Sequence, residues 1–202
     1  MPDDLEPLLQ EHGIAQTVLV QATDAVAETG FLLDLATQHD WIAGVVGWVD
    51  IQDPNSVAQL EAWSRHPKFK GIRPMLQDIE DPSWIAHAPH DNVVNALIRL
   101  GLRFDALVQP KHLQALLAFV HKWPALAVVI DHGAKPSMMD GWSTPWAQTW
   151  RSGMQALAEH PQIFCKVSGL LTETGLSAQA PEHFERCAAM ALGSMRFCPL
   201  KF

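Results

Sequence analysis

Six short apolar runs rich in β-branched residues recur along the 202-residue chain, and each is followed by a longer amphipathic stretch. The runs are apolar at nearly every position, which is typical of parallel strands covered on both faces. They occupy residues 17–21, 42–49, 69–76, 102–108, 126–131 and 163–168. Apolar positions three and four apart predict helices over residues 25–39, 53–63, 93–100, 113–123 and 145–159, with a weaker pattern near 184–190.

This unbroken β-then-α rhythm predicts an α/β protein and fits two architectures, an incomplete (β/α)8 barrel or a doubly wound sheet. A doubly wound nucleotide-binding sheet carries a glycine-rich turn after an early strand. The turn after Val20 reads Gln21-Ala22-Thr23-Asp24 and contains no glycine. We therefore favour the incomplete (β/α)8 TIM barrel, with the doubly wound sheet as the alternative.

Composition and charge narrow the class of partner. With 48% hydrophobic and 18% charged residues, the chain can bury one sizeable core. The formal net charge of -8 leaves no basic stripe for nucleic acid or an anionic membrane, so we expect a small-molecule ligand. Three cysteines without a C-x-x-C pair argue against a disulfide framework and a thiolate zinc site, and favour a reducing cytoplasm. The acidic N-terminus does not read as a signal peptide, and no apolar stretch approaches the roughly 20 residues of a membrane span.

Polar residues cluster where the predicted strands end. In a parallel barrel the loops after the strands form the catalytic face. The polar residues at these positions are Gln21, Asp50, Arg73, Gln77, Gln109, His112, Asp131, His132 and Ser168. Such a ring could orient a hydroxylated or carboxylated small molecule, although strand ends are also polar simply because they meet water.

His132 and Arg73 are the most informative members of this ring. His132 directly ends an all-apolar run, where it could ligate a metal, polarise a carbonyl or donate a proton. A helix-capping or core histidine is the alternative. Arg73 lies inside an apolar run, where a cation usually faces a carboxylate or an anionic substrate. Its alternative is an ion pair with Asp78 or Asp50.

Four segments occur in an order that resembles the sugar-lactonase branch of the amidohydrolase superfamily. They are Gly71-Ile72-Arg73-Pro74-Met75-Leu76-Gln77-Asp78, Phe104-Asp105-Ala106-Leu107-Val108-Gln109-Pro110-Lys111-His112-Leu113, Ile130-Asp131-His132-Gly133-Ala134-Lys135-Pro136 and Cys165-Lys166-Val167-Ser168-Gly169-Leu170. This branch includes L-fuconolactonase, L-rhamnonolactonase and 2-pyrone-4,6-dicarboxylate lactonase. The resemblance implies a (β/α)8 barrel in which the six runs are strands two to seven of eight.

The resemblance also implies an activity and roles for site residues. Members open lactones of sugar acids or related dicarboxylates by attack of water on the ester carbonyl, some with a bound divalent metal such as zinc and some without. His132 would be catalytic, facing the carbonyl or acting as a metal ligand. Arg73, Gln77, Gln109 and Ser168 would contact the substrate, a lactone or sugar acid.

Two family motifs are missing from the 202 residues. The family's first strand carries a His-x-His pair, and its last strand carries Gly-Ser-Asp-Trp-Pro, whose aspartate activates water. Neither occurs here, and no G-x-S-x-G elbow or Walker loop replaces them. We interpret residues 1–185 as a partial barrel and residues 186–202 as a divergent tail.

These departures set the functional expectation and its alternatives. We expect zinc or another divalent metal only in a longer parent protein, no bound metal in this chain, and little or no turnover by these 202 residues. One alternative is an inert barrel fragment that acts as a binding or interaction module and self-associates through exposed strand edges. Another is a decarboxylase of the same superfamily.

Overall fold

The structure, a computed structural model, describes residues 2–137 and 143–174. Its strands are β1 (Thr17–Val20), β2 (Ile42–Gly47), β3 (Phe69–Ile72), β4 (Arg103–Ala106), β5 (Val128–Ile130) and β6 (Ile163–Cys165). Its α-helices are α1 (Pro2–Glu11), α2 (Val26–Gln38), α3 (Ser56–Trp63), α4 (Trp84–His87), α5 (Asp91–Arg99), α6 (Leu113–Lys122) and α7 (Pro145–Ala158). Short 3-10 turns follow several strands: η1 (Leu76–Asp78), η2 (Pro110–His112), η3 (Asp131–Ala134) and η5 (Leu170–Thr174).

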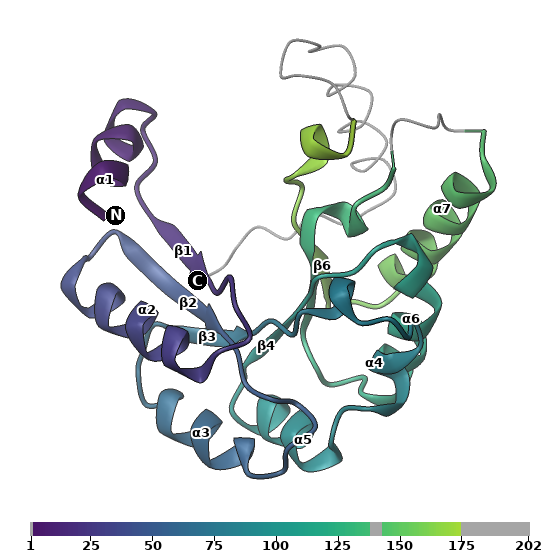
Figure 1. Ribbon diagram of the computed structural model, residues 1–202, viewed down its shortest axis with the longest axis horizontal. Helices are drawn as coiled ribbons and strands as arrows, with labels where there is room; N and C mark the ends of the chain where they lie inside the picture. Colours follow the sequence, from purple (N-terminus) through teal and green to yellow (C-terminus); the bar gives the residue numbers. More distant parts are fainter. Residues whose placement is uncertain (1, 138–142, 175–202) are drawn as a thin grey trace.

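The six strands form one parallel sheet in the order β1-β2-β3-β4-β5-β6. Each strand therefore lies beside its neighbour in sequence, and the order never reverses as it does in a doubly wound sheet. The sheet curls into an open half-barrel, with helices on its convex side (Figure 1). This confirms the predicted α/β barrel architecture and excludes the doubly wound alternative. Numbering the strands two to seven of eight stays a prediction.

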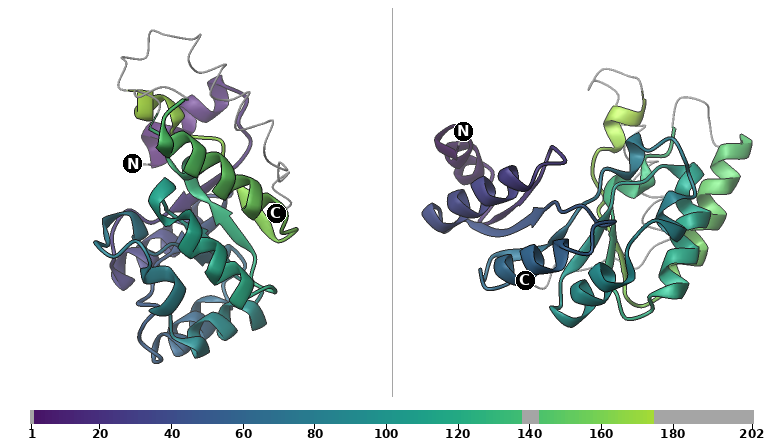
Figure 2. Two further views of the ribbon diagram at one scale, coloured as in Figure 1. Left: turned by 90° about the vertical axis from the view of Figure 1, so that its right-hand side faces the viewer. Right: turned by 60° about the horizontal axis from the view of Figure 1, so that its bottom comes forward.

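The core lies between the sheet and the helices on its outer face. Phe104 of β4 and Phe119 of α6 are fully buried, with ring centroids 5.2 Å apart. Turned views show α5, α6 and α7 following one another around the outside of the sheet (Figure 2). No helix in the described ranges has the length and apolarity to cross a membrane. The helical layer leaves the carboxyl ends of the strands free to carry polar groups.

The strands are shorter than the apolar runs that predicted them, because polar turns begin earlier. The run at 69–76 is a strand only as far as Ile72, since Pro74 has no N–H to donate and restricts the residue before it. The predicted helix at 53–63 begins at Ser56. The weaker helical pattern at 184–190 and the divergent tail at 186–202 lie outside the described residues.

Gly71 of β3 lies in close contact with the backbone of β4. It is paired with Arg103 of β4, and a Cβ at Gly71 would overlap the carbonyl oxygen of Arg103. We expect Gly71→Ala to lower the free energy of unfolding by on the order of 3 kcal/mol, because backbone and not a flexible side chain would have to move. Urea unfolding followed by circular dichroism measures this change.

Gly30 supplies the matched control for Gly71. It lies inside α2, and a Cβ there would meet nothing within 4 Å. Gly30→Ala should therefore raise the free energy of unfolding by roughly 0.5–1 kcal/mol through helix propensity. Equal stability of Gly71→Ala and the wild-type chain would show that the β3–β4 pairing tolerates a side chain at this point.

Candidate active site

Polar side chains from β1, β3 and β5 meet at the carboxyl ends of the strands. Gln21, fully buried directly after β1, donates from Nε2 to the carbonyl oxygen of Arg73 at 2.8 Å. In return, Arg73 Nη2 donates to Gln21 Oε1 at 2.9 Å. Arg73 Nη1 lies 3.4 Å from Oδ2 of Asp131, which follows β5. The guanidinium is thus fixed from two sides. Arg73 forms an ion pair, as its alternative interpretation expected, but the acid is Asp131 and not Asp78 or Asp50.

Asp131 also belongs to a second, deeper ion-pair cluster. Lys166, which follows β6, places Nζ 2.7 Å from Asp131 Oδ1 and also pairs with Asp105 of β4. Burial raises the pKa of Asp105 to about 6. Burial opposes the charge of Lys166, but the two carboxylates outweigh it and raise its pKa. The cluster therefore joins β4, β5 and β6 beneath the mouth of the half-barrel.

His132 lies in a left-handed turn that immediately follows β5. Residues 132–135 have φ angles of 47° to 62°, a region that costs non-glycine residues energy. The turn is held at Gly133, whose N–H donates to the Lys166 carbonyl at 3.0 Å and whose carbonyl accepts from Trp150 Nε1 at 2.7 Å. Backbone strain that the surroundings enforce is characteristic of functional sites.

The His132 imidazole packs against the loop that follows β6. Its Nδ1 lies 2.9 Å from Ser168 Oγ. Gly169 has φ +65°, and a Cβ at this residue would lie 2.8 Å from His132 Nδ1. The glycine thus makes room for the ring, and the serine fixes the orientation of its Nδ1 edge.

Electrostatics keep this imidazole neutral at pH 7. Burial lowers the pKa of His132 below its ordinary value of 6.5. The adjacent Asp131 opposes the shift, whereas the cations of Lys135, Lys166 and Arg73 add to it. A neutral imidazole can donate a hydrogen bond from one nitrogen while the other accepts one.

A second contact spans β4 at the carboxyl ends of the strands, between residues that follow β3 and β5. Lys135 Nζ donates to Gln77 Oε1 at 2.6 Å, which joins the turn after β5 to η1 after β3. Gln109 follows β4 closely in the sequence. Its backbone N–H donates to Nδ1 of the buried His112 at 2.9 Å. His112 therefore caps the start of η2. No contact in the described residues joins the Gln109 side chain to His132 or Arg73.

The remaining candidate, Asp50, lies apart from the cluster, and so do two further histidines. Asp50 is exposed, and its Oδ1 accepts from the Gln52 N–H at 2.9 Å in a local turn. His87 is exposed and lies 3.0 Å from Asp81, while His90 caps α5. Four of the predicted site residues are joined directly or through one intervening residue: Arg73, Gln77, His132 and Ser168. Gln109 contacts His112 instead.

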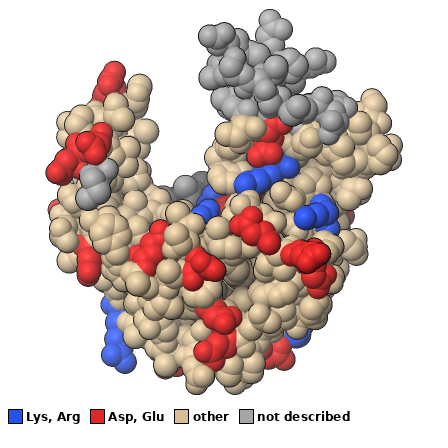
Figure 3. All heavy atoms as spheres, viewed as in Figure 1, with Lys and Arg blue, Asp and Glu red and all other residues tan. Residues whose placement is uncertain are grey.

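Of three further charged residues of the site, the sequence did not single out Asp105 and Lys166, and Lys135 was expected to lie in a solvated turn. A usable signal existed for two of them, since Asp105 and Lys166 are opposite charges inside otherwise apolar runs. Buried charges of this kind are rare unless paired. Figure 3 shows Lys and Arg side chains in the hollow on the concave side of the sheet. The surface below this hollow carries mainly Asp and Glu.

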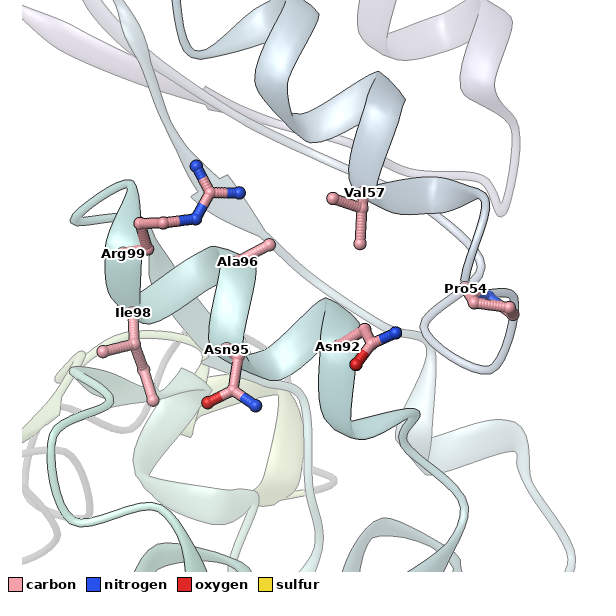
Figure 4. A pocket seen from close by; sticks show the side chains of 7 residues that line it. All are labelled: Pro54, Val57, Asn92, Asn95, Ala96, Ile98 and Arg99. Carbon is pink, nitrogen blue, oxygen red and sulfur yellow. The ribbon is translucent and has the colours of Figure 1, made fainter.

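A groove lies elsewhere on the molecule, away from these side chains. It has a volume of about 640 Å³ and runs between α3 and α5 on the outer helical surface (Figure 4). Its lining includes Asn92, Asn95 and Arg99, and Arg99 is already paired with Glu61 at 2.7 Å. The lining of this groove contains none of the side chains that meet around Arg73 and His132, so it is not the candidate active site.

Comparison with known proteins agrees with the arrangement of the strands. The family model described as Amidohydrolase matches residues 1–193. The chain belongs to the amidohydrolase family. An L-fucono-1,5-lactonase of Burkholderia ambifaria is 46% identical over 174 residues, which are 86% of this chain and 59% of the relative. An L-fucono-1,5-lactonase of Burkholderia multivorans is 35% identical over 199 residues, which are 95% of this chain and 67% of that relative.

A solved amidohydrolase of Burkholderia multivorans shares the fold. Its crystal structure with bound HEPES gives a TM-score of 0.87 at 34% identity and covers 96% of this chain and 69% of that one. A second crystal structure, with bound zinc, gives a TM-score of 0.84 at 32% identity. This amidohydrolase chain thus spans 59% of the first relative's length and about two thirds of the others.

The described residues of this amidohydrolase do not fit a zinc centre. Protein zinc sites use three or four His, Cys, Asp or Glu ligands. Residues 2–137 and 143–174 contain no group of three such residues placed around one point. Near His132, both oxygens of Asp131 face cations, and Nδ1 of the imidazole faces Ser168. A complete metal site would need ligands beyond this set.

Proposed function

We propose that the protein opens a sugar-acid lactone, of the class of L-fucono-1,5-lactone, by attack of water on the ester carbonyl. The observation that carries the proposal is the neutral, oriented His132 at the end of β5, beside Ser168 and among fixed cations. The 46% identity to an L-fucono-1,5-lactonase supports this substrate class. Water adds to the carbonyl carbon, the bond to the ring oxygen breaks, and a hydroxy acid forms.

In this proposal His132 polarises the carbonyl. When Ser168 Oγ donates to Nδ1, the proton of the neutral ring is on Nε2, which can donate to the carbonyl oxygen as negative charge develops. Arg73, Gln77, Gln109 and Ser168 would contact the substrate. Since Gln21 and Asp131 hold Arg73, it presents a fixed donor edge, which lowers the cost of ordering on binding.

We further propose that the 202 residues alone turn over slowly. The two carboxylates of the ion-pair cluster, Asp105 and Asp131, are both engaged by Lys166, so neither is free to activate water. The sequence also contains no Asp-Trp-Pro motif. A general base commonly contributes about 10²- to 10⁴-fold to the rate.

An interaction module is the second candidate, because both ends of the sheet are open. Within the described residues β1 pairs only with β2, and β6 only with β5. Near β1, several apolar side chains are exposed: Leu5, Leu8, Ile14, Val26 and Phe31. Open edges and exposed apolar groups favour self-association. Size-exclusion chromatography with light scattering tests this, and a monomer at all concentrations would contradict it.

A hydrolysis assay tests the lactonase proposal. Ring opening of L-fucono-1,5-lactone releases one proton per turnover at neutral pH, which a pH indicator follows. We expect the 202-residue chain to be near the uncatalysed rate, and a chimera to be active in which this chain replaces the matching segment of the Burkholderia ambifaria enzyme. A folded but inactive chimera would contradict the lactonase proposal. Appreciable turnover by the chain alone, abolished by His132→Ala, would contradict its catalytic incompleteness.

A further inference from the structure

Two contacts cross the carboxyl end of β4, and they differ in charge balance. The inner one, Arg73 with Asp131, joins a cation to a carboxylate, and Lys166 is likewise matched by Asp131 and Asp105. The outer one, Lys135 with Gln77, joins a cation to a neutral amide. In the described part of the chain no carboxylate forms an ion pair with Lys135. The two cations and the two carboxylates of the inner cluster balance one another. Among the described residues, the ammonium of Lys135 is therefore a positive charge without a matching carboxylate.

The position of Lys135 is enforced by the fold. Its φ of 47° lies in the left-handed region, which a lysine occupies at an energetic cost. Its Nζ is held at 2.6 Å by Gln77 from the far side of β4, and the side chain is half-buried. A solvated surface lysine has no need of either constraint. Lys135 is also close enough to His132 to lower the pKa of that imidazole.

We propose that Lys135, oriented by Gln77, is a binding residue for the carboxylate of the open sugar acid. An ammonium at a site mouth that pairs with no carboxylate of the described residues attracts an anion, although the chain as a whole carries a net charge of -8. The amide of Gln77 keeps an N–H₂ group that can donate to the same anion.

The chemistry of the proposed reaction supplies such an anion, so the inference rests on the proposed function. A lactone is neutral at its ester group. Addition of water and cleavage of the bond to the ring oxygen yield a hydroxyl group and a carboxylic acid, which loses its proton near pH 7. The carboxylate is the one charge that distinguishes product from substrate, and Lys135 would bind this group.

The test compares binding of L-fuconate and of the neutral polyol L-fucitol to the 202-residue chain by isothermal titration calorimetry. Loss of a charge-assisted hydrogen bond is worth roughly 10- to 100-fold in affinity. We expect Lys135→Met to weaken L-fuconate binding by about that factor and to leave L-fucitol unchanged. Lys135→Arg should retain most of the affinity. Raised salt should weaken L-fuconate binding to the wild-type chain and to Lys135→Arg, which keep the cation, but not the residual binding to Lys135→Met.

Two further variants separate a binding role from a structural one. Lys122→Met removes an exposed lysine from α6, with the same change in net charge, and should bind L-fuconate normally. Lys135→Gly relieves the left-handed backbone, so it should unfold no earlier than the wild-type chain and still lose affinity.

The outcomes distinguish this inference from the proposed function. Unchanged L-fuconate affinity in Lys135→Met would overturn the role of Lys135 even if the lactonase proposal holds. Lys135-dependent binding of D-gluconate with no preference for L-fuconate would support Lys135 as a carboxylate contact and contradict the fucose-acid substrate. Absence of binding of either acid at millimolar concentration would overturn the inference.

Discussion

Asp131→Asn is expected to lower the free energy of unfolding by about 3–5 kcal/mol. The carboxylate of Asp131 is 1% exposed and lies 3.4 Å from Arg73 Nη1 and 2.7 Å from Lys166 Nζ. The amide keeps the size of the side chain but leaves two partly buried cations facing a neutral group. Removing one member of a buried charge cluster costs far more than removing an exposed ion pair, because the remaining charges stay desolvated.

Urea unfolding measures this effect, since urea, unlike guanidinium chloride, does not screen the ion pairs. Asp91→Asn is the matched control, because Asp91 pairs with Lys122 at 2.8 Å on the exposed surface of the helical layer. That pair should contribute only about 0.2–1 kcal/mol. If both variants unfolded at the same urea concentration, the Arg73–Asp131–Lys166 cluster would not stabilise the half-barrel.

Local sequence patterns predicted the fold well because they reflect burial on both faces of each strand. Runs such as 42–49 and 126–131 contain β2 and β5, and their continuous apolar character identified a parallel sheet. The polar residue that ends each run marked the catalytic face, which placed Arg73 and His132 at the same edge of the sheet. The amidohydrolase match and the strand order then confirmed the barrel type.

The partners of the charged residues could not be predicted in the same way. Arg73 pairs with Asp131, 58 residues away and two strands along the sheet, whereas the sequence offered only nearby acids. Lys166 and Asp105 are likewise 61 residues apart. Contacts of this kind depend on the curl of the sheet and on the turn at 132–135. Three of the four residues of that turn are not glycine, so the sequence did not indicate its left-handed backbone.

His132→Ala in the lactonase chimera should lower kcat by about 10²- to 10⁴-fold, with a smaller effect on KM. The reason is that the imidazole would act on charge that develops in the transition state, so its loss affects the chemical step more than ground-state binding. Ser168→Ala should give a smaller loss, because the ring stays and only its Nδ1 contact is removed. His12→Ala is the control, since His12 is exposed beyond α1.

The pH dependence of the chimera provides a separate check on the role of His132. Burial lowers the pKa of His132, so the neutral ring is the dominant form above the ordinary value of 6.5 and for some distance below it. We expect kcat to be constant from pH 8 down past 6.5 and to fall only in more acidic solution, as the ring gains a proton. A rate that falls already on going from pH 8 to pH 7 would show that the titrating group is not this imidazole. Equal activity of His132→Ala and His12→Ala would remove His132 from the mechanism altogether.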